Sequence, residues 1–381
     1  MTTKVRLITN SEYKILFVNL KQIIKETIIK RSGPIGFDEF MDIALYFPGL
    51  GYYSSGVTKF GEQGDFITAP ETSDLFGYTL ARQCDEVING KNDILEFGAG
   101  TGILATQILF ELGRMGNLPN KYYILELSAE LRHRQKQTIS KVLPEIVDKV
   151  VWLESLPSNF SGVVIANEVL DAMPAKRLIC KDESFYELGV NIENGDLAWD
   201  VIESLFIKNN VLLPNNVVND YKTEVNYRSM AWINSLYSSM DECLVLIIDY
   251  GMDRAEFFHP QRGEGTLRCY YKHKASDNPF TNLGKQDITT SVNFSDIADQ
   301  AKESGFNVAG YATQAMFLIS LGIDNYLSKE DNEKQRIKLS QQIKQLVLPN
   351  AMGESFKVLA LTKNLKLNLK GFNEQDLRHK L

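Results

Sequence analysis

A short apolar segment followed by three glycines at alternate positions constrains the fold more than any other part of this sequence. Ile94 to Phe97 has the character of a buried strand, and Gly98, Gly100 and Gly102 follow it directly. The next residues, up to Leu112, have helical spacing. Glycines let the backbone turn tightly and approach a ligand closely. The segment therefore predicts a strand, a ligand-binding loop and a helix in succession.

Further apolar runs of strand length alternate with helical patterns. The predicted strands cover residues 122–127, 150–153, 162–166, 244–249, 306–311 and 356–361, and helices are predicted at 128–143 and 332–347. Such alternation is typical of parallel strands connected by helices. We therefore predict an α/β fold with a Rossmann-like sheet that carries helices on both faces.

The segments around this sheet differ from it in character. Helical patterns at residues 13–30, 37–46 and 75–88 predict an N-terminal helical extension, and the polar residues 177–214 predict an inserted β-rich segment. We divide the chain into the extension, which would contribute to the cofactor site (1–90), the first half of the core (91–176), the insertion (177–240), the second half of the core (241–365) and a C-terminal tail (366–381).

The residues beside the glycine loop indicate which ligand it binds. A nicotinamide fingerprint needs G-x-G-x-x-G, but here the third glycine comes one residue early and Ile103 stands in its place. Glu96 lies two residues before Gly98, where a carboxylate would repel a pyrophosphate and attract the cationic amino end of S-adenosyl-L-methionine. We expect that compound as the cofactor, bound across Gly98, Gly100 and Gly102, and S-adenosyl-L-homocysteine as its product.

Glu126 ends the second predicted strand, next to the first one in a doubly wound sheet. A carboxylate at this edge can accept hydrogen bonds from both hydroxyls of a ribose. The alternative is an acidic residue at a helix N-terminus, with Ser128 as the cap. We favour ribose binding because the glycine loop precedes Glu126 by some thirty residues.

Asn167, Glu168 and Asp171 follow the predicted strand at residues 162–166. Strand ends at this edge line the ligand crevice of open α/β sheets. Two carboxylates could hold a guanidinium, whose planar fork suits them, so we predict the acceptor and catalytic residues here. The alternative is a helix start capped by Asn167.

Several further motifs resemble one family of methyltransferases. They are Gly33-Pro34-Ile35, Gly51-Tyr52-Tyr53, residues 60–71 (FGEQGDFITAPE), Phe76-Gly77, residues 167–174 (NEVLDAMP), residues 248–251 (IDYG), Asp287-Ile288-Thr289, residues 314–323 and Met352-Gly353-Glu354. In these motifs the chain resembles the MidA-like class I S-adenosyl-L-methionine-dependent methyltransferases, over most of residues 33–362. The block from Gly64 to Glu71 is specific, whereas the glycine loop marks only the broad superfamily.

The resemblance implies a class I methyltransferase sheet whose cofactor site is formed partly by the N-terminal extension. It places Gly64, Asp65, Thr68 and Pro70 near the cofactor. Mitochondrial members of the family methylate an arginine of a partner subunit during complex I assembly, so a protein substrate is expected. Two alternatives stay open: a methyltransferase acting on a small molecule, and an assembly factor that binds the cofactor without catalysis.

Composition bears on the partners and the compartment. The formal net charge of −7 argues against a general nucleic-acid binder. The four cysteines are far apart, which predicts neither a metal site nor a disulfide framework. No apolar run has the roughly 18–20 residues of a membrane-spanning helix, so no membrane insertion is expected.

We predict a cytoplasmic protein, or one of the mitochondrial matrix if eukaryotic. The oligomeric state stays open, as does the choice between a general base and a surface residue for His273.

Overall fold

The computed structural model describes residues 3–4, 17–55, 68–205, 212–215, 217–328 and 330–381. Its central sheet has the strand order β16-β17-β11-β6-β3-β4-β5, with the short β15 (Val292–Asn293) beside the end of β11. The strands are β3 (Asp93–Phe97), β4 (Tyr122–Leu125), β5 (Val150–Leu153), β6 (Phe160–Asn167), β11 (Met240–Met252), β16 (Asn307–Thr313) and β17 (Phe356–Lys363). β17 runs antiparallel to both of its neighbours, and the pairings from β11 to β5 are parallel.

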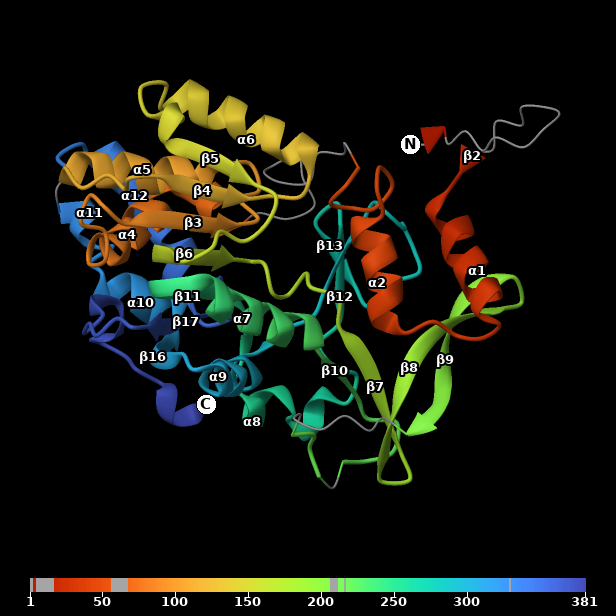
Figure 1. Cartoon of the computed structure of the whole chain (residues 1–381). Coiled ribbons are helices and arrows are strands. Elements are labelled where there is room, and N and C mark those ends of the chain that lie inside the picture. Colours follow the sequence, from red (N-terminus) through yellow and green to blue (C-terminus); the bar gives the residue numbers. More distant parts are fainter. Residues whose placement is uncertain (1–2, 5–16, 56–67, 206–211, 216, 329) are drawn as a thin grey trace.

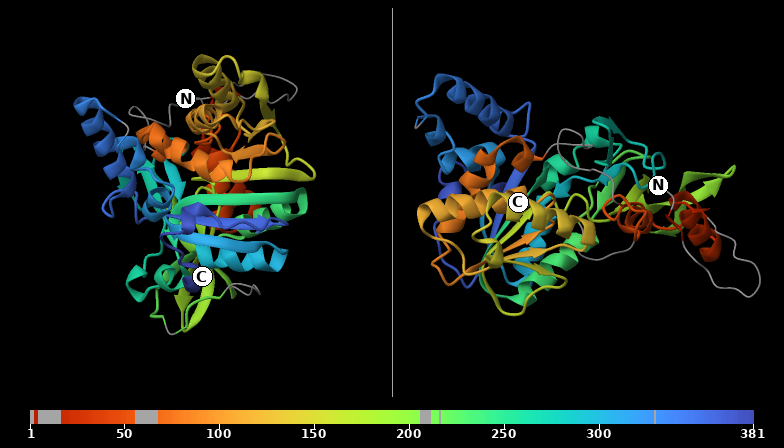
Figure 2. Two further views of the ribbon diagram at one scale, coloured as in Figure 1. Left: turned by 90° about the vertical axis from the view of Figure 1, so that its left-hand side faces the viewer. Right: turned by 90° about the horizontal axis from the view of Figure 1, so that it is seen from above.

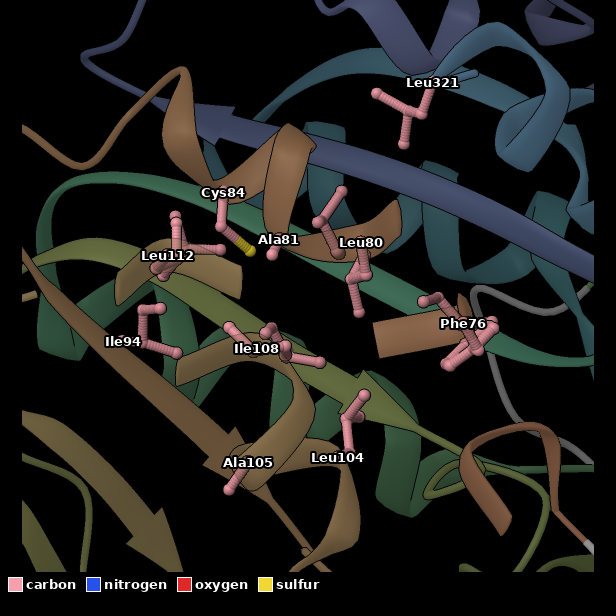
Figure 3. Packing of buried hydrophobic residues seen from close by; sticks show 14 of the residues in the cluster. Phe76, Leu80, Ala81, Cys84, Ile94, Leu104, Ala105, Ile108, Leu112 and Leu321 are labelled. Carbon is pink, nitrogen blue, oxygen red and sulfur yellow. The ribbon is translucent and has the colours of Figure 1, made fainter. Parts of the chain in front are cut away.

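Helices cover both faces of this sheet, as the two views in Figure 2 show. Successive strand residues point to opposite faces, so Ile94 and Leu95 belong to different apolar clusters. One face packs against α4 (Asp74–Asp85), α5 (Ile103–Met115), α6 (Ala129–Val142), α10 (Gln314–Ser320) and α12 (Glu333–Val347). Figure 3 shows Leu80 and Cys84 of α4 with Ile108 and Leu112 of α5 in this cluster. The other face packs against α7 (Tyr227–Ser239) and α9 (Phe294–Ser304).

A smaller lobe stands beside the sheet and includes α1 (Leu20–Arg31) and α2 (Phe37–Tyr46) (Figure 1). The polar segment after residue 176 forms an antiparallel sheet of order β10-β7-β8-β9, made of β7 (Lys176–Lys181), β8 (Ser184–Glu193), β9 (Asp196–Leu205) and β10 (Lys222–Val225). A second small sheet contains β12 (Arg268–Tyr271), β13 (Lys274–Ser276) and β14 (Asp287–Thr289). Residues of α1, α2, β8, β9, β12 and β14 share one apolar cluster. The extension and the insertion are therefore packed together.

The start of the first helix differs from the sequence-based prediction. The helix predicted from residue 13 begins at Leu20, because the side chain of Asn19 accepts a hydrogen bond from the amide of Gln22 and caps it. Phe17–Val18 form the short strand β2, and residues 13–16 lie outside the described part of the chain.

No helix in the described residues is long and apolar enough to cross a membrane.

The segment predicted as a C-terminal tail packs on the core. Leu369 and Phe372 are buried in the cluster that contains α10, and the ring of Phe372 lies 5.3 Å from that of Phe317. Farther along, the amide of Leu377 donates to the carbonyl of Tyr311 on the edge strand β16 at 2.6 Å. The chain end therefore covers the edge of the sheet.

We expect Phe372→Ala to lower the free energy of unfolding by about 3 kcal/mol, because it empties a buried site of ring size. Leu367→Ala is the matched control: Leu367 is in the same segment but exposed, so its removal should cost less than about 1 kcal/mol. Urea unfolding followed by circular dichroism measures both. Equal small effects would mean that the segment does not stabilise the core.

Candidate functional site

A cavity of about 1200 Å³ opens at the carboxyl ends of β3, β4 and β6. Its wall also includes residues of α2, α3 (Ala69–Thr72), β14 and the end of β11. The described lining residues include eight carboxylates: Asp42, Glu71, Glu96, Glu126, Glu130, Glu168, Asp171 and Asp287. Within the same set, the one lysine or arginine is Arg228, whose Nη1 lies 2.6 Å from Oδ1 of Asp42. The cavity is therefore strongly acidic.

The glycine loop forms one wall of this cavity, between β3 and α5. Gly98, Gly100 and Gly102 have φ angles of 59°, 51° and 85°, in the region that favours glycine. A Cβ at Gly102 would come within 3.0 Å of the Cα of Gln135, so the helix α6 leaves no room for a side chain there. The loop brings bare backbone to the surface of the cavity.

Glu96 lines the cavity at the end of β3 and is almost completely buried. The hydroxyl of Tyr122 donates to its Oε2 at 2.8 Å. Burial raises the pKa of Glu96 to about 8, against the lowering effect of this hydrogen bond. A cation bound beside Glu96 would favour its charged form.

Glu126 lines the cavity beyond the end of β4, and both of its oxygens are held. Oε1 accepts from the amide of Ser128 at 2.9 Å, and Oε2 accepts from Nε2 of Gln135 at 3.1 Å. Ser128 also caps α6 by accepting from the amide of Leu131, so the cap that we weighed as the alternative exists beside the carboxylate. Gln135 also donates to the carbonyl of Gly100 and thus joins Glu126 to the glycine loop. Sequence reasoning missed Gln135, which sits within a helix without any motif.

The N-terminal extension reaches the cavity through the residues around α3. Thr68 and Pro70 line it, as does Glu71, whose Oε1 accepts from the hydroxyl of Thr101 at 2.6 Å. The carbonyl of Pro70 accepts from Nε2 of Gln107 on α5 at 2.8 Å. The two other extension residues predicted near the cofactor, Gly64 and Asp65, lie outside the described residues.

The segment after β6 is a turn, and the alternative of a helix capped by Asn167 is wrong. The turn is held by Asp249 on the neighbouring strand β11. Its Oδ2 accepts from the amides of Val169, Leu170 and Asp171 at 3.2, 2.8 and 3.3 Å. These three contacts hold the backbone of the turn against β11. Glu168 begins the turn with a φ of 55°.

This turn places Glu168 and Asp171 in the cavity wall together with Asp287 of β14. Burial raises the pKa of Glu168 to about 8, and the charge of Asp249 adds to the increase. Burial also raises the pKa of Asp171 well above its usual value, as do the charges of Asp249 and Asp287. The acids therefore form a partly buried cluster that a bound cation would stabilise.

Aromatic side chains from the extension stand beside these acids. The hydroxyl of Tyr53 donates to Oδ1 of Asp287 at 2.9 Å, and the ring of Tyr53 stacks on that of Tyr46 with centroids 5.4 Å apart. The hydroxyl of Tyr46 donates to the carbonyl of Ala172 in the turn. Sequence reasoning assigned no role to Asp287, because no spacing connects it with Glu168 more than a hundred residues earlier.

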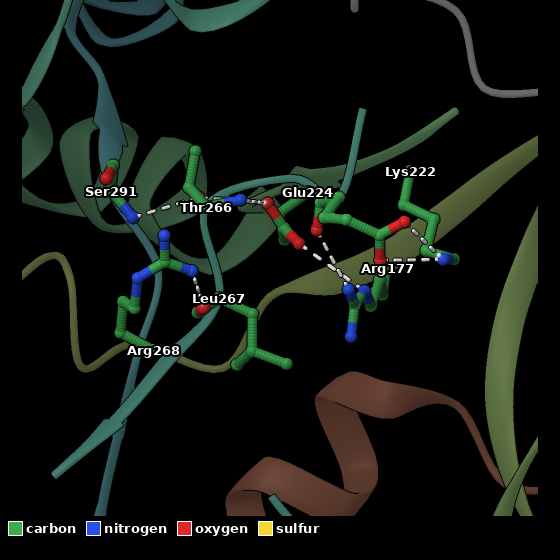
Figure 4. A network of polar contacts seen from close by, with 8 residues as sticks. Arg177, Lys222, Glu224, Thr266, Leu267, Arg268 and Ser291 are labelled. Carbon is green, nitrogen blue, oxygen red and sulfur yellow. Dashed lines mark hydrogen bonds and ion pairs between the residues drawn. The ribbon is translucent and has the colours of Figure 1, made fainter. Parts of the chain in front are cut away.

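A buried polar network connects the insertion sheet with the segments that flank β12 and β14 (Figure 4). Asp287 lies on β14. Arg177 of β7 and Glu224 of β10 form an ion pair, with Nε and Oε1 3.5 Å apart. Oε2 of Glu224 accepts from both the amide and the hydroxyl of Thr266, at 2.7 and 2.9 Å. The Thr266 hydroxyl in turn accepts from the amide of Ser291. The insertion therefore braces the chain on both sides of β12 and β14.

His273 is exposed at the turn between β12 and β13 and is not among the residues that line the cavity. Its φ of 60° and that of Lys272, 50°, fit a tight hairpin turn. In the part of the chain that the structure describes, no three histidine, cysteine, aspartate or glutamate side chains are grouped to hold a metal ion.

The order of the main strands, counted along the chain, is 3-2-1-4-5-7-6, with the seventh reversed. This sheet, with a glycine loop after its first strand, defines a class I methyltransferase, as predicted. Residues 77–312 match the family model described as "Putative S-adenosyl-L-methionine-dependent methyltransferase". The match covers more than half of the chain, and the chain therefore belongs to this family.

Relatives and solved structures agree with this assignment. The structure resembles a Burkholderia thailandensis protein bound to S-adenosyl-homocysteine, with 35% identity, a TM-score of 0.90 and coverage of 95% of this chain and 96% of that one. "Protein arginine methyltransferase NDUFAF7 homolog, mitochondrial" of Caenorhabditis elegans is 27% identical over 90% of this chain and 86% of that protein. The Xenopus tropicalis "Protein arginine methyltransferase NDUFAF7, mitochondrial" is 28% identical over 89% and 85%.

The chain is thus a methyltransferase that depends on S-adenosyl-L-methionine. The cavity fits this cofactor in size and charge, because a sulfonium and an ammonium can both be balanced by its acids.

We expect Glu96→Gln to make the protein less sensitive to pH between about 4.5 and 8. The raised pKa of Glu96 means that the unfolded chain loses this proton first, so wild-type stability falls as pH rises through that window. The variant lacks this loss. Its free energy of unfolding, relative to that of the wild type, should therefore increase by roughly 2–4 kcal/mol from pH 5 to pH 8. Urea titrations at several pH values measure it, with the exposed Glu154→Gln as the control. Parallel curves for wild type and Glu96→Gln would contradict the expectation.

Proposed function

We propose that this methyltransferase acts on a protein and that its acceptor is an arginine side chain. The observation that carries the proposal is the charge of the cavity, which has eight carboxylates and one already paired guanidinium among its described lining residues. A guanidinium stays cationic at ordinary pH and offers a flat fork of donors that matches carboxylates. The names of the two animal relatives, both arginine methyltransferases, support the same acceptor.

Asn167, Glu168 and Asp171 form the proposed acceptor side, and Asp287 joins them there. The Asp249 anchor sets the turn that carries Glu168 and Asp171, while Tyr53 holds Asp287. The turn backbone and Asp287 are held by contacts within the protein, so these groups need little ordering when a guanidinium binds. The cost of burying several acids together is offset when a cation enters.

The proposed reaction asks two things of these residues. When bound, S-adenosyl-L-methionine supplies a methyl group that is already a strong electrophile. The carboxylates have to hold the guanidinium so that one of its nitrogens faces this carbon. That nitrogen loses a proton as its bond to carbon forms and the carbon–sulfur bond breaks. Glu168, whose pKa burial raises to about 8, is suited to accept the proton.

The size and opening of the cavity support a protein substrate. Its volume of about 1200 Å³ exceeds the roughly 300–1,000 Å³ of a site for one small ligand. Space therefore exists for a cofactor and a side chain together. Leu127, which lines the cavity, is 74% exposed and offers an apolar rim on which a polypeptide could rest.

For the donor, we propose binding along the opposite wall. Glu126 would accept hydrogen bonds from the ribose, and Glu96 would lie near the amino-acid end. The other proposed donor contacts are the glycine loop and the extension, namely Gly98, Gly100, Gly102, Thr68 and Pro70, with Gly64 and Asp65 proposed from the family resemblance alone.

Replacing Glu126 tests the donor placement. Glu126→Gln removes the charge that would bind the ribose hydroxyls, so we expect roughly tenfold weaker binding of S-adenosyl-L-homocysteine by calorimetry. Glu154→Gln, on the exposed surface after β5, is the matched control and should bind as the wild type does. Unchanged affinity for Glu126→Gln would move the ribose elsewhere.

Transfer of a labelled methyl group tests the acceptor. The protein and its Glu168→Gln variant would each be incubated with methyl-labelled S-adenosyl-L-methionine and an extract of cells that lack the protein. We expect label in a protease-sensitive band that hydrolyses to methylarginine with the wild type. With Glu168→Gln, donor affinity should stay within a few fold and the label should be lost, because the substitution removes the proton acceptor.

Other outcomes would replace the proposal. Label only in small, protease-resistant material would establish a small-molecule acceptor, and label on another amino acid would overturn the choice of arginine. Donor binding without any transfer would favour an assembly factor that binds the cofactor without catalysis.

A further inference from the structure

Glu71 is a carboxylate of the cavity that the proposed reaction does not yet use. It belongs to α3 in the N-terminal extension and lies beside the glycine loop, where Oε1 accepts from the hydroxyl of Thr101 at 2.6 Å. Within the described residues, no lysine, arginine or histidine forms an ion pair with it. A negative charge is thus held at the cavity wall without a cationic partner in that part of the chain.

The position of Glu71 is set by contacts on both sides. The carbonyl of Pro70 accepts from Nε2 of Gln107, which also donates to Oδ1 of Asp74 at 3.0 Å. A Cβ at Gly77 would come within 2.3 Å of the Gln107 side chain, so α4 and α5 are close-packed here. The short helix α3 therefore rests on a rigid base, and Glu71 has little freedom to move away from the loop.

If the ribose of the donor lies at Glu126, the charged amino-acid end of the donor lies beside Glu71. From Glu126 the amino-acid part would extend over the glycine loop, where an anionic partner would stabilise its α-ammonium. Glu96 is one such partner at the start of the loop, and Glu71 borders the same loop at Thr101. The two acids come from different parts of the chain and could bind the same ammonium.

We propose that Glu71 binds the α-ammonium group of the donor and that Thr101 positions its carboxylate for this contact. The inference rests on the proposed placement of the donor and extends it. It assigns the N-terminal extension the recognition of the amino-acid end, while the sheet recognises the nucleoside. The competing explanation is structural: Glu71 would only fasten the extension to the loop, and its loss would weaken every ligand alike.

Three adenosine thioethers separate these explanations. S-adenosyl-L-homocysteine has both the ammonium and the carboxylate, its decarboxylated amine keeps only the ammonium, and 5′-methylthioadenosine lacks both. For Glu71→Gln we expect roughly 10- to 100-fold weaker binding of the first two and unchanged binding of the third, as measured by calorimetry. Thr101→Val keeps the charge but removes its anchor, so it should show a smaller loss with the same selectivity.

Two results would overturn the inference. Equal losses for all three ligands would mean a structural role, and no loss for any of them would mean that the ammonium binds elsewhere. Glu126→Gln distinguishes these from a failure of the donor placement, because all three ligands keep the ribose and should lose affinity together. If Glu126→Gln has no effect, the placement fails, whatever Glu71→Gln does.

Discussion

The carboxylate of Asp249 holds together the part of the molecule on which the site depends. It is fully buried on the central strand β11 and accepts from three successive amides of the turn after β6, as well as from its own neighbour Tyr250. The amide of Leu170 is buried, and leaving it without a partner would cost about 1–3 kcal/mol. One side chain thus fixes the backbone that carries Glu168 and Asp171. It also places a negative charge beside them, which helps to raise their pKa values.

Grouping these acids is electrostatically unfavourable by itself, and a bound cation offsets that cost. Burial and mutual repulsion raise the pKa values of Glu96, Glu168 and Asp171. A cation that enters is therefore stabilised by these acids more than a neutral molecule of the same shape. The acids therefore favour cationic ligands over neutral ones. In the proposed function, the same principle would serve a cationic donor at one wall and a cationic acceptor at the other.

The sequence was sufficient for the central sheet and for the residues at its strand ends. The alternation of strands and helices is a local pattern; the glycine loop, Glu126 and Glu168 directly follow apolar strands, and Glu96 lies near the end of one. Gly98, Gly100 and the three acids line the cavity, because the ends of parallel strands meet at one edge of a sheet, whereas Gly102 packs against α6. Asp287, Tyr53 and Gln135 could not be found in this way. They reach the cavity through tertiary packing, from a hairpin strand, a loop and the inside of a helix, and no local pattern indicates such contacts.

The extra segments matter because the sheet alone would leave the acids open to water. The extension and insertion share an apolar cluster with β12 and β14, and the buried Arg177–Glu224 pair ties the insertion to Thr266, just before β12. A single buried ion pair contributes little net stability, but it fixes the partners in one arrangement because a misplaced charge is costly. Since Asp287 lies on β14, the insertion helps to set where Asp287 stands relative to Glu168 and Asp171. A change in the insertion would thus move Asp287 while leaving the glycine loop and Glu126 unaffected.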